Sequence, residues 1–159
     1  MNRTIKLRLL ARPPVPVSTA ISKTAEGYIL ASLEKVLGCS FNADAVLPVD
    51  IGVRPDAVDL ENKIVVEVYA RVGEVKGGQL HKIKGDVLKL ALIDKRLGPG
   101  WRKIICFASD EAAKYIKGKS WVAEAAREFN IEVYVVELPV EQMNKVISAQ
   151  HRQRMVNPS

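Results

Sequence analysis

The chain has 159 residues, of which 48% are hydrophobic and 26% charged, a composition that indicates one globular domain and excludes a disordered or fibrous chain. Its longest apolar stretches have four or five residues, far fewer than the roughly 20 that cross a bilayer, so no membrane partner is expected. The net charge of +6 favours contact with a polyanion such as nucleic acid.

The two ends of the sequence are basic and differ from its centre. Residues 1–17 combine scattered Arg and Lys with three closely spaced prolines, which predicts a basic N-terminal arm and a Pro-rich connection. We expect the folded domain over 18–150 and a basic flexible tail over 151–159. The arm lacks the apolar core of a signal peptide, so a cytoplasmic location is the default expectation. With only two cysteines, the chain builds neither a multi-bridge disulfide framework nor a four-cysteine zinc site.

Hydrophobic periodicity predicts helices that alternate with strands along the chain. In order, the predicted elements are a helix at 22–37, strands at 43–49, 54–60 and 63–71, a helix at 78–97, a strand at 102–108, helices at 110–116 and 120–129, a strand at 131–138 and a helix at 139–150. Pro48 and Pro55 weaken the first two strands, because proline belongs at strand starts, edges or bulges. This order predicts a single α/β domain with a mixed sheet flanked by helices.

The predicted hairpin formed by 54–60 and 63–71 carries two acidic residues. A two-residue turn at Glu61 and Asn62, with Asn62 tolerating a positive φ, sets Asp56 directly opposite Glu67. Like charges that face each other on a sheet are destabilising, so the pair invites a counter-charge. Mg²⁺ suits it, since this ion is commonly held by one or two carboxylates and a substrate phosphate. Solvation, or pairing with a neighbouring Lys63, Arg54 or Arg71, is an equal alternative.

These residues resemble the PD-(D/E)XK nucleases, in which a Pro-Asp strand start, a short hairpin and a Glu-x-Lys strand carry the active site. Here the motif reads Pro55-Asp56 and Glu67-Val68-Tyr69, and the resemblance in element order covers about 22–138. It implies a restriction-endonuclease-like core of order α-β-β-β-α-β with added helices and a strand. It also implies an acidic residue on the first helix, a position that Glu26 fits. An exposed Glu26 that favours the helix dipole is an equal alternative.

The sequence departs from the family pattern where Tyr69 replaces the motif lysine. Tyrosine is a poor general base because its unperturbed pKa is near 10. The following helix offers substitutes, since Gln79, Lys82, Asp86 and Lys89 fall within an arc of about 80° beside its apolar stripe. The alternative is a solvated helix with a Lys82–Asp86 pair. Arg71 is a third candidate for the positive charge.

The resemblance implies a Mg²⁺-dependent (or Mn²⁺-dependent) endo- or exodeoxyribonuclease that hydrolyses phosphodiester bonds in nucleic acid, with DNA favoured. Asp56 and Glu67 would ligate the metal, and Glu26 would bind it through water. Lys82 or Lys89 would steady the nucleophile. Tyr69, Gln79 and Arg71 would line the pocket.

Two other functions are kept open. The first is a catalytically inactive nuclease-fold module that binds nucleic acid or a protein partner. The second is a small-molecule enzyme on a Rossmann-like sheet, which is disfavoured because no glycine-rich phosphate loop follows a strand. The sequence is also compatible with a homodimer.

Overall fold

The computed structural model describes residues 5–7, 24–42, 44 and 46–156, and these form one α/β domain around a five-stranded mixed sheet. The described elements are, in chain order, β1 (Ile5–Leu7), α1 (Ala25–Leu37), β2 (Ala57–Asp59), β3 (Ile64–Tyr69), α2 (Gly78–Leu97), β4 (Arg102–Phe107), α3 (Asp110–Lys117), α4 (Trp121–Glu128), β5 (Ile131–Val136) and α5 (Val140–Val156). The predicted fold class, a single α/β domain with a mixed sheet flanked by helices, is confirmed.

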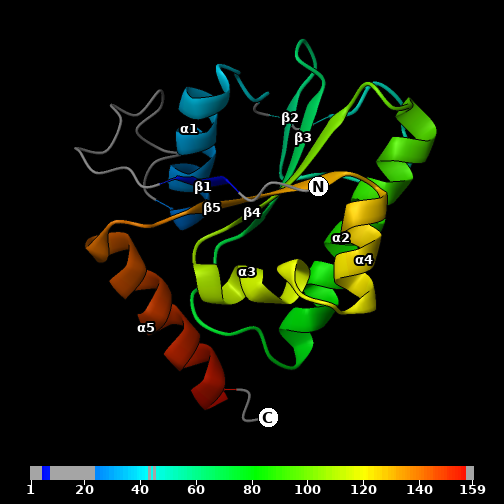
Figure 1. Ribbon diagram of the computed structural model, residues 1–159. Coiled ribbons are helices and arrows are strands. Elements are labelled where there is room, and N and C mark those ends of the chain that lie inside the picture. Colours follow the sequence, from blue (N-terminus) through cyan, green and yellow to red (C-terminus); the bar gives the residue numbers. More distant parts are fainter. Residues whose placement is uncertain (1–4, 8–23, 43, 45, 157–159) are drawn as a thin grey trace.

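The strands lie in the order β1-β5-β4-β3-β2, and only β2 runs antiparallel to its neighbour. Helix α2 connects the parallel strands β3 and β4, while α3 and α4 connect β4 and β5. Both crossovers place their helices on one face of the sheet, whereas α1 covers the other face (Figure 1).

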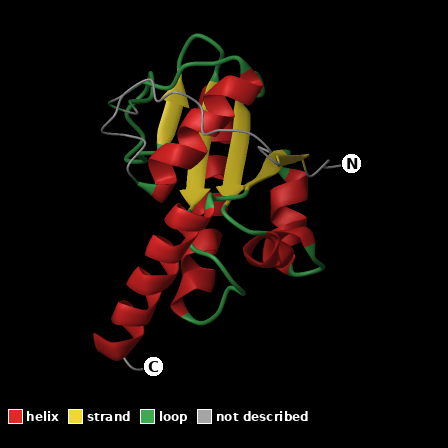
Figure 2. Cartoon of the chain, turned by 90° about the vertical axis from the view of Figure 1, so that its left-hand side faces the viewer, coloured by secondary structure: helices red, strands yellow, loops and turns green. Residues whose placement is uncertain are grey.

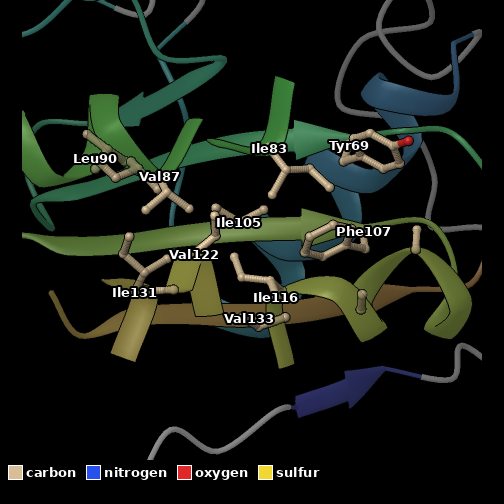
Figure 3. Close-up of a cluster of buried hydrophobic side chains, with 14 of the residues drawn as sticks. Tyr69, Ile83, Val87, Leu90, Ile105, Phe107, Ile116, Val122, Ile131 and Val133 are labelled. Carbon is tan, nitrogen blue, oxygen red and sulfur yellow. The ribbon is translucent and has the colours of Figure 1, made fainter. Parts of the chain in front are cut away.

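Two apolar layers hold the helices against the sheet. The first layer joins α2, α3 and α4 to the strands, and ten of its side chains are labelled in Figure 3. The second layer joins α1 to the opposite face, where Ile29 and Leu33 are fully buried. Side chains of β3 alternate between the two layers, so Val65 and Tyr69 face α2 while Val66 and Val68 face α1.

Helix α5 packs loosely against the rest of the domain. None of its residues is buried, and it extends away from the sheet in both views of the molecule (Figures 1 and 2). Its contact with the loop after β3 depends on Gln150, whose amide donates to the Val72 carbonyl oxygen and whose carbonyl oxygen accepts from the Val72 N–H. None of the helices in the described part of the chain is long and apolar enough to span a membrane.

Three expectations about the ends of elements are wrong. The described residues of 43–49 form no strand, because this stretch pairs with no neighbour. The last helix does not end near 150 but continues to Val156, so most of the expected flexible tail is helical. Residues Ile5–Leu7 of the expected arm form a strand, because they pair in parallel with β5. The rest of the arm and the Pro-rich connection lie outside the described residues.

Candidate active site

Asp56 and Glu67 meet at the edge of the sheet. The register pairs Ala57 with Val66, and continuing it by one residue places Asp56 opposite Glu67, as the sequence predicts. The turn differs in detail, because Lys63 and not Asn62 adopts the positive φ, 55°. The carboxylate of Asp59 fixes this turn by accepting hydrogen bonds from the backbone N–H and side-chain amide of Asn62.

The Asp56 carboxylate is anchored at the end of the hairpin. Its Oδ2 accepts a hydrogen bond of 2.7 Å from the N–H of Val68. Pro55 is buried directly before it, which limits how far the chain can move at this point. Asp56 is thereby held beside Glu67, and its negative charge is one of the causes that raise the pKa of Glu67.

Helix α2 brings three charged side chains to this edge. Lys82 Nζ lies 2.8 Å from Asp86 Oδ2 and 3.3 Å from the Val68 carbonyl oxygen. Lys89 Nζ lies 3.2 Å from Asp86 Oδ1 and 3.3 Å from Glu67 Oε1. The Asp86 side chain is only 3% exposed, so one buried carboxylate holds both lysines against β3. Three of the four residues of the predicted arc, Lys82, Asp86 and Lys89, therefore converge on the acidic pair.

Asp56, Glu67, Lys82, Asp86 and Lys89 together form what we call the acidic cluster, and Glu67 is its least satisfied polar group. Its side chain is 1% exposed, and Oε2 has no hydrogen-bond partner among the described residues. Burial raises the pKa of Glu67 to about 8, with further increases from the charges of Asp56 and Asp86 and from a hydrogen bond that the protonated Glu67 carboxyl makes with Asp56, while Lys89 opposes the shift. Since an unpaired buried carboxylate oxygen is costly, this atom favours a proton or a cation beside it.

Glu26 belongs to the surroundings of the cluster. It lies in the first turn of α1, after the N-cap Thr24, and its side chain is exposed. Partial burial is the largest cause that raises the pKa of Glu26, followed by the charge of Asp56, while Lys82 opposes the shift. Glu26 is therefore within electrostatic reach of Asp56 and Lys82, although no hydrogen bond joins it to either within the described chain.

Three other expected pocket residues lie beside the acidic cluster. Tyr69, Arg71 and Gln79 all line one cavity of about 850 Å³ next to α5, and neither Asp56 nor Glu67 contributes to its lining. The Tyr69 ring packs into the core against Phe107, with ring centroids 5.7 Å apart (Figure 3). Arg71 points to α5, where it donates to Gln153 Oε1 at 2.7 Å. Arg71 is therefore not the positive charge of the acidic pair.

The donor set of the cluster suits a hard divalent cation. No group of three or more Asp, Glu, His or Cys side chains in a metal-binding arrangement occurs in the residues that the structure describes. Mg²⁺ requires fewer protein ligands, because it keeps several waters and is commonly held by one or two carboxylates with substrate phosphates. Asp56, Glu67 and the Val68 carbonyl supply oxygen ligands of this kind, and the unpartnered Glu67 Oε2 is the observation that fits an ion.

No family model, curated protein or solved structure matches this chain. The assignment of a function therefore depends on the site alone.

Two features of the site were missed or undervalued in the sequence. The sequence predicts Asp86 as a member of the arc on the helix and as a partner of Lys82, but its spacing of three residues before Lys89 also places it beside the second lysine. The end of α5 that lines the cavity of about 850 Å³ is predicted to be a flexible tail, because the polar sequence after Gln150 carries no apolar periodicity that would extend the helix.

Proposed function

We propose that this chain is a metal-dependent nuclease of the PD-(D/E)XK type that hydrolyses phosphodiester bonds in nucleic acid, with DNA the favoured substrate. The observation that carries the proposal is the Glu67 carboxylate. It is buried, its Oε2 has no hydrogen-bond partner among the described residues, and it lies close to both the Asp56 carboxylate and the ammonium group of Lys89. Most buried polar side-chain atoms in folded proteins have a hydrogen-bond partner, so this oxygen is an exception that an ion would explain.

Asp56 and Glu67 would hold a Mg²⁺ or Mn²⁺ ion, together with the Val68 carbonyl oxygen. Such an ion polarises the phosphate and lowers the pKa of a bound water. The hydrogen bond from the Val68 N–H holds the Asp56 carboxylate in place. Folding therefore orders this ligand before the ion binds, and binding loses less conformational entropy. Glu26, at the edge of the cluster, would contact the ion through water.

Lys82 and Lys89 would supply the positive charge that the missing motif lysine provides elsewhere in the family. Their side chains are 45% and 40% exposed, so both can reach a phosphate at the protein surface. Asp86 holds each ammonium group by one carboxylate oxygen and keeps both lysines on the same side of β3. In this position they would stabilise the charge that develops on the phosphate and orient the attacking water.

A second candidate function is an inactive module on the same fold that binds nucleic acid or a protein partner. The observation in its favour is that Lys82 and Lys89 already pair with the buried acids, so the cluster is partly neutralised without an ion. The presence of Tyr69 at the position of the motif lysine also favours an inactive module. This candidate predicts neither metal binding nor cleavage.

Calorimetric titration with Mg²⁺ and Mn²⁺, combined with cleavage assays on linear, branched and single-stranded DNA, separates the two functions. The nuclease proposal predicts metal binding by the wild-type chain and a loss of cleavage by about 100-fold or more in Asp56→Asn and Glu67→Gln. Glu61→Gln, at an exposed acid in the same hairpin turn, is the matched control and should retain activity. Absence of both metal binding and cleavage in the wild-type chain would favour the inactive module.

A further inference from the structure

A second polar site adjoins the acidic cluster. The cavity of about 850 Å³ lies between the loop 70–77 and the C-terminal part of α5, and we name it the α5 groove. Its lining includes Arg71, Lys76, Gln79, Gln150, Gln153 and Arg154. Both walls are at the same end of the molecule, where α5 and the start of α2 extend below the sheet (Figures 1 and 2).

Hydrogen bonds join the two walls of the groove and fix their relative position. The Gln150 amide makes two hydrogen bonds to the backbone of Val72, at 3.0 and 3.1 Å, in the manner of a neighbouring strand. The Arg71 guanidinium donates to Gln153 from the opposite wall. Met143 and Val146 pack the first half of α5 against the second apolar layer, and these polar contacts hold its C-terminal part at the groove.

The α5 groove has an excess of positive charge. Arg71 and Arg154 form no salt bridge within the described chain, and the partner of Arg71 is a neutral amide. Among the lining residues that the structure describes, Glu74 is the one acid, and it pairs with Lys76 at 3.4 Å. Two guanidinium groups thus remain uncompensated, and a guanidinium binds phosphate oxygens in bidentate fashion.

The groove also lies directly beside the proposed catalytic residues. Gln79 in its lining precedes Lys82 by three residues on α2, which is about 4.5 Å along the helix axis. Tyr69 and Arg71, which also line the groove, follow Glu67 on β3 and on the loop after it. A polymer bound in the groove would therefore continue to the acidic cluster.

We infer that the α5 groove binds the phosphodiester backbone of the nucleic-acid strand that flanks the scissile phosphate, with Arg154 and Arg71 contacting its phosphates. The inference rests on the proposed nuclease function, because adjacency to the acidic cluster identifies the polyanion as the substrate itself. Glutamine amides and the loop backbone supply further neutral donors to phosphate and sugar oxygens. The groove would contribute affinity, and the acidic cluster would contribute the chemistry.

The test measures binding without cleavage, in the Glu67→Gln background, using fluorescence anisotropy of a labelled single-stranded oligonucleotide and of a duplex of the same length. Arg154→Gln should weaken binding roughly five- to ten-fold and reduce the slope of log K against log salt by about 0.7 for the single strand. Arg152→Gln is the matched control. It removes the same charge from the same helix but points about 200° away from Arg154, and it should change affinity less than about two-fold.

Equal effects of Arg152→Gln and Arg154→Gln, or no effect of Arg154→Gln, would overturn the groove assignment even if the wild-type chain cleaves DNA. Binding that depends on Arg154 in a wild-type chain that neither binds metal nor cleaves would instead overturn the proposed hydrolysis and support the groove as a binding site. Arg71→Gln serves as a second variant, with circular dichroism to check that α5 remains helical after its contact with Gln153 is lost.

Discussion

Lys89 Nζ lies 3.3 Å from Oε1 of the buried Glu67 carboxylate, while Oε2 of the same group has no partner among the described residues. One lysine that is 40% exposed therefore does not satisfy this acid. Glu67 consequently dominates what the site should do when the pH or the concentration of divalent cations changes.

Stability should fall as the pH rises, because folding raises the pKa of Glu67 from 4.5 to about 8. The folded state favours the protonated carboxyl of Glu67. The stability that this protonation contributes is therefore fully present below pH 4.5 and is lost as the pH passes through 8. Without divalent ions, the free energy of unfolding should decline between these values by at most about 1.4 kcal/mol per pH unit. Urea unfolding from pH 5 to 8.5 in EDTA measures this slope.

Two glutamine variants show whether Glu67 causes this slope, one at Glu67 itself and one as a control at an exposed acid. Glu67→Gln should remove most of the decline, whereas Glu128→Gln, at an exposed acid on α4, should leave it unchanged. Identical slopes for wild type and Glu67→Gln would show that Glu67 is ionised at neutral pH in the folded chain.

Metal binding should release a proton near neutral pH. With a pKa of about 8, the Glu67 carboxyl is largely protonated at pH 7, and a cation that binds it must displace the proton. Titration of the wild-type chain with Mg²⁺ in two buffers that differ in ionisation enthalpy should reveal release of close to one proton. At pH 9 the release should vanish, and binding without release at pH 7 would place the ion on other ligands.

The hairpin of β2 and β3 shows how much of the candidate site can be predicted from the sequence. The pairing of Asp56 with Glu67 was predicted, because a short polar turn between two apolar runs leaves a single register that buries both of them. Lys82 and Lys89 were predicted because helical periodicity alone fixes which side chains share a face.

Other parts of the structure depend on packing between distant segments and could not be derived locally. Ile5–Leu7 is a strand only because β5 offers an edge, and the end of α5 is set by contacts such as Gln150 with Val72. The sequence places Tyr69 on the same face as Glu67. It does not reveal that the Tyr69 ring packs into the apolar layer between α2 and the sheet.

The two lysines should separate catalysis from substrate binding. Lys82→Gln and Lys89→Gln remove charges that lie beside the acids, so kcat should fall by roughly 10²–10⁴-fold while KM changes little. Lys95→Gln, at an exposed position in the last turn of the same helix, is the matched control. Steady-state cleavage rates decide the outcome, and full activity in the Lys82/Lys89 double variant would remove both residues from the mechanism.

Asp86→Asn should act through these lysines. The substitution keeps the size of a side chain that is 3% exposed but takes the counter-charge from Lys82 and Lys89, so kcat should fall with little change in KM. Because both lysines are partly exposed, the loss in unfolding free energy should stay near 1–2 kcal/mol. The charge of Asp86 also raises the pKa of Glu67, so the decline of stability with pH should end at a lower pH in this variant. A loss of stability without any change in kcat or in this pH profile would limit Asp86 to a structural role.

Restoring the family lysine at position 69 should damage the protein instead of activating it. The Tyr69 side chain is 2% exposed and packs against Phe107, so Tyr69→Lys would remove an aromatic contact and bury an ammonium group. We expect a loss of about 3 kcal/mol or more in unfolding free energy and no gain in cleavage. Tyr69→Phe keeps the ring and should cost less than about 1 kcal/mol, which separates packing from the hydroxyl group. A stable Tyr69→Lys chain with faster cleavage would mean that position 69 reaches the acidic cluster, and that Lys82 and Lys89 have not replaced the motif lysine.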